Sequence, residues 1–375
     1  MLAKTKGSNR PFFAYGILFI CLCTLIISIG LNGWAFEPAS TNPSFGPSAE
    51  VLLKMGAKQS HLIVNSYQLW RLFSPMILRK LSNSSLLDDT YLFAMISQCT
   101  CLSTLDGGIV HFLLNSFAIF YIGRAVEQNH GSFNAAILFA MPAVGSTIIS
   151  AIFLPQFISV GASGGIFGLI GACVAEIIKN RKLLFSDFIN KGRSKRHHTV
   201  IVMILVLDIF LNLLMGLTPY TDNFMHVGGF VLGFICASTM LGQVNIEGEE
   251  SRFKSPATSL FTRYFGLLVC CICIIVSTVI LFNGDGITSP CEDCGVLSCV
   301  SFPPWADYDK KWWYCDDCGG VTAFGIRDEV TNEYSSLEME CPQGHTIVFS
   351  LDGLENSKVA LQQNLSIFCR ERCFN

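Results

Sequence analysis

Long apolar blocks separated by short polar segments make up the first three quarters of the chain. A bilayer core needs about 20 apolar residues per helix, or about 17 to 25 with tilt, and seven blocks approach that length. The pattern therefore predicts an all-α polytopic membrane protein built as a helix bundle. The expected spans cover residues 12–31, 107–122, 133–152, 163–178, 199–217, 224–241 and 264–282.

Composition agrees with this class, because only 14% of the residues are charged, against roughly 25% in soluble domains. The net charge is −3, so nothing in the chain favours nucleic-acid binding. The first block follows Lys4, Lys6 and Arg10 but is about 20 residues long and lacks a clear small-x-small cleavage site. We expect a retained signal anchor there rather than a removed signal peptide.

Basic residues predict the orientation, because Lys and Arg of short loops stay in the cytosol. The N-terminal tip (1–10) and the loop over 179–198 are both basic, and alternation of the spans puts both on the cytosolic side. The membrane domain then covers 11–283, with a long outer loop over 34–106, and a polar tail over 284–375 is luminal or extracellular. This indicates an integral membrane protein of the secretory pathway, in the Golgi, plasma membrane or endosomes.

The tail holds eight of the 17 cysteines, and two chemistries suit them. Two C-x-x-C pairs with 20 residues between them have the spacing of a zinc ribbon. An even number of cysteines in an exported segment instead favours disulfides, which we expect from the predicted topology. Asn83-Ser84-Ser85 and Asn364-Leu365-Ser366 are glycosylation acceptors on the predicted outer side. The cysteines are Cys291, Cys294, Cys299, Cys315, Cys318, Cys341, Cys369 and Cys373.

Polar residues inside membrane spans are costly, so they mark candidate chemistry. The fourth block opens with Gly161-Ala162-Ser163-Gly164-Gly165. A serine flanked by glycines at a helix start is open to a substrate backbone, and the unpaired N–H groups there can stabilise an oxyanion. The same glycines also suit close helix packing through Gly164-x-x-x-Gly168. This segment alone leaves catalysis and packing as alternatives.

Two histidines lie near the outer ends of apolar blocks, His111 in the second and His226 in the sixth. If Gly229-x-x-x-Gly233 packs on the glycine face of the fourth span, His226 and Ser163 meet at one depth. A histidine within about 3 Å of a serine hydroxyl can take its proton. His111 and Asn115 share a helix face and can donate to an oxyanion; their alternative role is a buried interhelical hydrogen-bond pair.

Four motifs follow one another along the chain: Trp70-Arg71, His111-x-x-x-Asn115, Gly161-Ala162-Ser163-Gly164, and Asp222-Asn223 followed by His226-Val227-Gly228-Gly229. In this order and on these spans, they resemble the motifs of the rhomboid intramembrane serine proteases over about residues 11–283. Six core helices plus a C-terminal seventh resemble the eukaryotic secretory-pathway subgroup.

The resemblance implies roles for these residues. Ser163 would be the nucleophile and His226 the general base. His111, Asn115 and the Ser163 N–H would form the oxyanion hole. It further implies cleavage of single-pass membrane proteins within or near their membrane helix, without a metal or cofactor. Inactive relatives lose the serine or the histidine, and this chain keeps both.

Other residues have supporting roles in this interpretation. Phe167 would pack beside His226, and Glu127 with Arg124 would stabilise the cytosolic side. From their residue types alone, Trp70 and Arg71 are expected at the outer bilayer interface, with the arginine reaching lipid head groups.

Two other functions stay open at this point. A non-proteolytic adaptor or chaperone would bind transmembrane helices in the same groove and would not need Ser163. A transporter would use Asp208, His111 and His226 as a relay. Asp208 lies in mid-span outside the matched motifs, and we expect a structural, partnered role for it.

Overall fold

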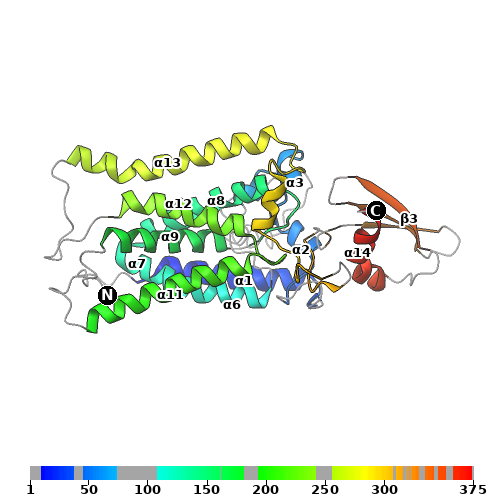
Figure 1. The fold of residues 1–375 in the computed structure, drawn as a ribbon, viewed down its shortest axis with the longest axis horizontal. Coiled ribbons are helices and arrows are strands. Elements are labelled where there is room, and N and C mark those ends of the chain that lie inside the picture. Colours follow the sequence, from blue (N-terminus) through cyan, green and yellow to red (C-terminus); the bar gives the residue numbers. More distant parts are fainter. Residues whose placement is uncertain are drawn as a thin grey trace, which may run out of the picture.

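The computed structural model forms an elongated helix bundle with a small α/β lobe at one end (Figure 1). We call this end, where the helices carrying Ser163 and His226 begin, the tail end. The structure describes residues 10–37, 45–73, 108–160, 162–180, 193–241, 256–306, 310–315, 318, 321, 323–328, 334–341, 345–351 and 358–373.

Each of the predicted spans coincides with a long helix. Among the described residues, five helical stretches are long and apolar enough to cross a membrane. Helix α9, with 17 residues, and the apolar Leu205–Met215 part of α11 are shorter. The second span continues to His130, beyond its predicted end, because α6, η2 and α7 form one continuous helix. The helices are α1 (Phe12–Leu31), α6 (Ile109–Ala118), the π-helical turn η2 (Ile119–Gly123), α7 (Arg124–His130), α8 (Ser132–Phe153), α9 (Ser163–Lys179), α11 (Arg193–Met215), α12 (Asn223–Met240) and α13 (Pro256–Asn283).

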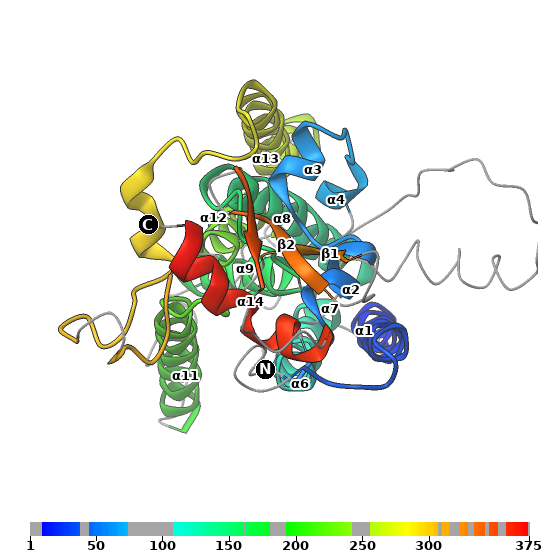
Figure 2. The same cartoon turned by 90° about the vertical axis from the view of Figure 1, so that its right-hand side faces the viewer.

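Helix α9 lies at the centre of the bundle when it is viewed from the tail end (Figure 2). It packs against α8 and α12, while α13, α1 and α6 lie further out. Its first ten residues are all buried, Ser163 among them. A helix that is buried all round belongs to a core, so α9 presents no lipid-facing side there. Helix α11 stands to one side (Figure 2).

Glycines let the backbones of α9 and α12 come together. A Cβ atom on Gly229 would overlap the carbonyl oxygen of Gly164, and one on Gly233 would overlap that of Gly168. Such small-residue faces are how membrane helices approach closely. The glycine-face packing expected from the sequence is therefore confirmed.

The described part of the outer loop folds into short helices at the tail end: α2 (Ala49–Lys54), α3 (Ser60–Val64) and α4 (Trp70–Phe73). Arg71 is buried there and donates to the Ala57 carbonyl at 2.6 Å and to the Gln68 side chain at 2.7 Å. Burial lowers the pKa of Arg71 to about 10. The expectation that Arg71 reaches lipid head groups was wrong, because its guanidinium satisfies buried loop carbonyls instead.

Glu127 is fully buried at the opposite end of the second span. Its two carboxylate oxygens accept from the backbone N–H groups of Phe13 and Ala14, each at 2.8 Å. The first N–H groups of a helix lack intrahelical partners, so Glu127 caps α1 from another helix. Arg124 lies on the same helical stretch with its guanidinium over the Phe120 ring, and its stabilising role together with Glu127 stays a prediction.

The tail forms a three-stranded antiparallel sheet with a helix packed on it. The elements are η3 (Glu292–Leu297), β1 (Ala323–Arg327), β2 (Tyr334–Glu340), β3 (Thr346–Ser350) and α14 (Lys358–Cys373), with sheet order β1-β2-β3. All eight tail cysteines are in disulfides, as expected: Cys291–Cys294, Cys299–Cys315, Cys318–Cys369 and Cys341–Cys373. All four cysteines of the two C-x-x-C pairs, on which the zinc interpretation was based, therefore form disulfide bonds.

The glycine packing yields a stability prediction. Gly233→Ala places a methyl group against the Gly168 carbonyl, and overpacking of this kind costs about 1 to 3 kcal/mol. We expect a lower thermal unfolding midpoint in detergent. Gly16→Ala on α1 is the matched control, because a Cβ there meets nothing within 4 Å and alanine favours helix. Equal midpoints for the two variants would contradict the close α9–α12 approach.

Candidate active site

Ser163 is the first residue of α9 and is only 8% exposed. Its hydroxyl points at α12, where the Met225 sulfur accepts from Oγ at 3.6 Å. The Cβ position of Gly164 faces the Ser146 hydroxyl of α8, so only a glycine fits after Ser163. Gly161, the other flanking glycine of the motif, lies outside the described residues.

His226 lies in the first turn of α12 and is buried. The Phe167 ring, one helical turn after Ser163, stacks on the imidazole with ring centroids 4.1 Å apart and planes 11° apart. This contact fixes the plane of the imidazole. Among the described residues, the buried Nδ1 atom of His226 has no hydrogen-bond partner, so this nitrogen is not engaged by an acidic orienting group.

The second span brings its polar residues to the same end of the bundle. His111 and Asn115 lie on α6, one turn apart, with Asn115 buried and His111 half-buried. Helix α6 contacts α9, which in turn packs against α12. Residues from α6, α9 and α12 therefore converge, whereas Glu127 lies at the far end of the second span.

The comparisons with known proteins agree with this arrangement. A family model described as Rhomboid domain matches residues 94–243. RHOMBOID-like protein 7 of Arabidopsis thaliana is 33% identical over 73% of this chain and 79% of its own length. The chain belongs to the rhomboid family.

Two further relatives are a second plant protein and a bacterial protease. RHOMBOID-like protein 2 of Arabidopsis thaliana is 31% identical over 73% of this chain and 77% of its own length. Rhomboid protease GluP of Bacillus subtilis is 29% identical over 64% of this chain and 36% of its own length. Arabidopsis thaliana also has an inactive RHOMBOID-like protein. The rhomboid described here is an integral membrane protein of a serine protease family that includes inactive members.

A buried polar network supports the start of α12 in this rhomboid. Asp222 is the N-cap residue, and its Oδ1 accepts from the Met225 N–H at 3.0 Å. Its Oδ2 accepts a short hydrogen bond from the Ser150 hydroxyl of α8. Lys58 of the outer loop, 2% exposed, donates through Nζ to Ser150 Oγ at 3.0 Å and to the Leu154 carbonyl at 2.7 Å.

Sequence reasoning missed Lys58 and Ser150 and treated Asp222 only as part of a motif. Lys58 follows Ala57 in a loop without periodic pattern, and its partners lie 92 and 96 residues away. In the fold, a β-bridge joins Lys58 to Ser159 in the α8–α9 connection, and the Ser60 hydroxyl donates to the Ala151 carbonyl of α8 at 2.7 Å. An acid at the N-cap position before an apolar helix was the one available signal.

Asp208 on α11 is half-buried and accepts from the Asn212 side chain at 3.2 Å, one turn along the same helix. This is the partnered arrangement expected from its mid-span position. The Asn212 amide also donates to the Asp208 carbonyl at 2.9 Å. Both contacts lie within α11, so they tie Asp208 to its own helix.

The Lys58 network predicts a difference between two lysines four residues apart. Lys58→Met leaves the buried Asp222–Ser150 pair without its cation, and breaking a buried charge network costs about 3 to 5 kcal/mol. We expect a markedly lower unfolding midpoint. Lys54→Met is the control, because Lys54 is 70% exposed and pairs with the exposed Glu50, a contact worth less than about 1 kcal/mol. Similar midpoints for both variants would show that Lys58 is not structurally engaged.

Proposed function

We propose that this rhomboid is an intramembrane serine endopeptidase in which Ser163 is the nucleophile and His226 the general base. The observation that carries the proposal is the junction of α9 and α12. There the Ser163 hydroxyl contacts Met225, and the neighbouring His226 stacks on Phe167. Membership of a family that includes a bacterial rhomboid protease supports intramembrane proteolysis in general.

The reaction would proceed by acyl transfer. Ser163 Oγ attacks the scissile carbonyl carbon while His226 takes the hydroxyl proton, which it then gives to the leaving amine. Water attacks the resulting acyl-serine ester while His226 takes a proton from it, and His226 gives that proton to the departing Ser163 oxygen. His111, Asn115 and the Ser163 N–H are the proposed oxyanion donors, each worth about 10² to 10³ in rate. No metal ion or cofactor enters these steps.

The proposed substrates are single-pass membrane proteins cleaved within or near their transmembrane helix. A helix keeps its carbonyls hydrogen-bonded, so a substrate must unwind locally before Ser163 can attack. Small or helix-breaking residues near the cleavage site would lower that cost.

We also propose the topology. The basic N-terminus and the basic 179–198 loop would be cytosolic, and the tail end, with the active site and the disulfide-bonded lobe, would face the lumen or exterior. Disulfides persist in such compartments and are rare in the cytosol, so the four pairs of the tail support this side.

The nucleophile is tested with a single-pass substrate co-reconstituted in liposomes. Ser163→Ala removes the attacking oxygen, so we expect cleavage to fall by about 10³-fold or more and labelling by a fluorophosphonate probe to disappear. Ser238→Ala is the control, because its hydroxyl only bonds back to Ile235 at 2.8 Å within α12. Equal cleavage by Ser163→Ala would overturn the proposal. A folded parent that cleaves none of several substrates would favour a helix-binding adaptor.

The topology is tested through Asn364, an exposed acceptor residue on α14. If the tail enters the secretory pathway, a glycosidase should shift the parent protein on a gel, and Asn364→Gln should reduce that shift. Asn332→Gln is the control, since Asn332 is followed by Glu333 and Tyr334 and is not in an acceptor triplet. Digestion of the tail by a protease added to the cytosolic side of sealed microsomes would show that the tail is cytosolic and would contradict the proposed orientation.

A further inference from the structure

The segment between α13 and the tail lobe crosses the tail end of the bundle. We call this segment, Asp285–Val300, the brace. Its first part is tied to the outer loop, to the end of α8 and to the α8–α9 connection. Asn65 donates to the Asp285 carbonyl at 3.0 Å, Gln156 to that of Ile287 at 2.9 Å, and Ser289 to that of Phe153 at 3.0 Å.

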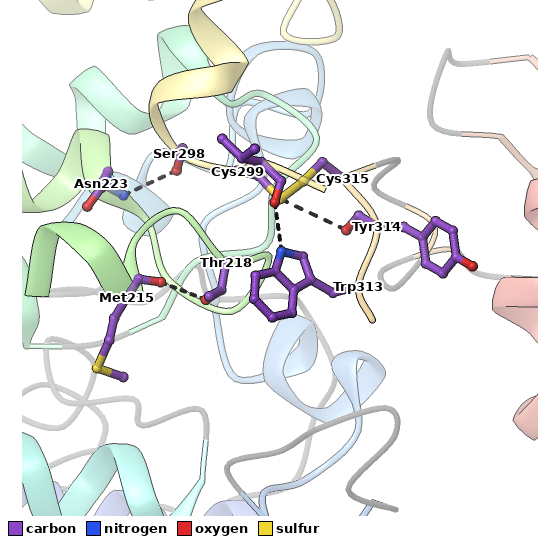
Figure 3. The surroundings of a disulfide bond; sticks show 9 residues. Met215, Thr218, Asn223, Ser298, Cys299, Trp313, Tyr314 and Cys315 are labelled. Atoms are coloured by element: carbon purple, nitrogen blue, oxygen red, sulfur yellow. Dashed lines mark hydrogen bonds between the residues drawn. A yellow bond between two sulfur atoms is a disulfide. The ribbon is translucent and has the colours of Figure 1, made fainter. Parts of the chain in front are cut away.

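The far part of the brace is bound to the turn between α11 and α12 (Figure 3). The Asn223 backbone N–H donates to the buried Ser298 hydroxyl at 3.2 Å. The Asn223 side-chain amide donates to the Leu297 carbonyl at 2.8 Å. The Val300 N–H in turn donates to the Leu217 carbonyl at 2.9 Å. Three hydrogen bonds therefore join the brace to the residues that lead into α12.

Asn223 is the junction of these contacts. Its side-chain amide also donates to the Leu213 carbonyl of α11 at 3.1 Å, so one side chain links α11, α12 and the brace. Its Oδ1 atom lies against Gly216, where a Cβ would overlap it. The fit leaves little room for another side-chain position, and Asn223 is buried.

The brace is fastened immediately after this contact. Cys299 forms a disulfide with Cys315, and the Trp313 indole N–H donates to the Val300 carbonyl at 2.8 Å. Figure 3 shows both links next to the Asn223–Ser298 hydrogen bond. The tail segment that contains Trp313 and Cys315 therefore holds the end of the brace in place.

The braced residue is the first of the helix that carries His226. Met225, which contacts Ser163, and His226, which stacks on Phe167, lie in that same turn. Displacement of reacting groups by about 1 Å can cost 10²-fold in rate. A shift of the first turn of α12 would move both contacts at once.

We propose that the brace positions the first turn of α12, and with it His226, through the positioning residues Ser298 and Asn223. The exported tail is then a working part of this rhomboid rather than an appended module. The inference rests on the proposed protease function for its consequence in rate, and on the hydrogen bonds alone for its consequence in structure.

Ser298→Ala and Asn223→Asp test the brace in the full-length protein in liposomes. The first removes the acceptor of the Asn223 N–H. The second keeps the side-chain shape but turns an oxygen toward the Leu213 and Leu297 carbonyls. Cleavage kinetics on a single-pass substrate should show kcat reduced by about 3- to 10-fold or more, with KM within about twofold. Hydrogen–deuterium exchange should speed up in the peptide that covers the first turn of α12.

Ser301→Ala is the matched control in the adjacent tail, and Ser298→Thr restores a hydroxyl. Both should keep the parent kcat and exchange rate. Unchanged kcat in both test variants, or a loss of kcat that merely follows the unfolding midpoint, would overturn the positioning role. An inactive parent would overturn the protease proposal instead. The exchange comparison still decides the brace in that case, because unchanged exchange in Ser298→Ala would overturn it.

Discussion

The contact between the backbones of α9 and α12 is the constraint on which the arrangement depends. With no side chain at Gly164 or Gly229, the two helices approach until one backbone fills the space where a Cβ would be. That approach sets both the depth and the rotation of α12 against α9. Ser163 precedes Gly164 directly and His226 precedes Gly229 by less than one turn. The register of the glycines is therefore also the register of the two candidate catalytic residues.

The second constraint is that two helices begin in buried surroundings. Carboxylates cap these helix N-termini, one at each end of the bundle. The first N–H groups of a helix have no partners in their own helix and carry partial positive charge. Asp222 caps α12 at the tail end from its own chain position, Ser150 donates to the carboxylate, and Lys58 donates to Ser150. Glu127 caps α1 at the opposite end from another span. Both carboxylates are buried, so each stabilises the fold only while its hydrogen-bond partners are in place.

The block pattern was enough to place the long helices, because apolar length is a strong local signal. Glycine spacing also predicted the α9–α12 face. The pattern could not supply contacts between distant segments. Arg71 was assigned to lipid from its type, while its actual partners are loop atoms. Cysteine count predicted disulfides but not their pairing, since eight cysteines allow roughly a hundred arrangements. The candidate catalytic residues were found by motif order, and their roles stay predictions.

The cap on α1 has a consequence for the order of events during synthesis. Glu127 lies 113 residues after Ala14, whose N–H it binds. A ribosome makes α1 before the second span, so the first backbone N–H groups of α1 lack these acceptors when the helix is made. Water and lipid head groups must accept these hydrogen bonds until the second span has been made and brings Glu127. The docking of α1 in the bundle therefore depends on a helix that is made after it.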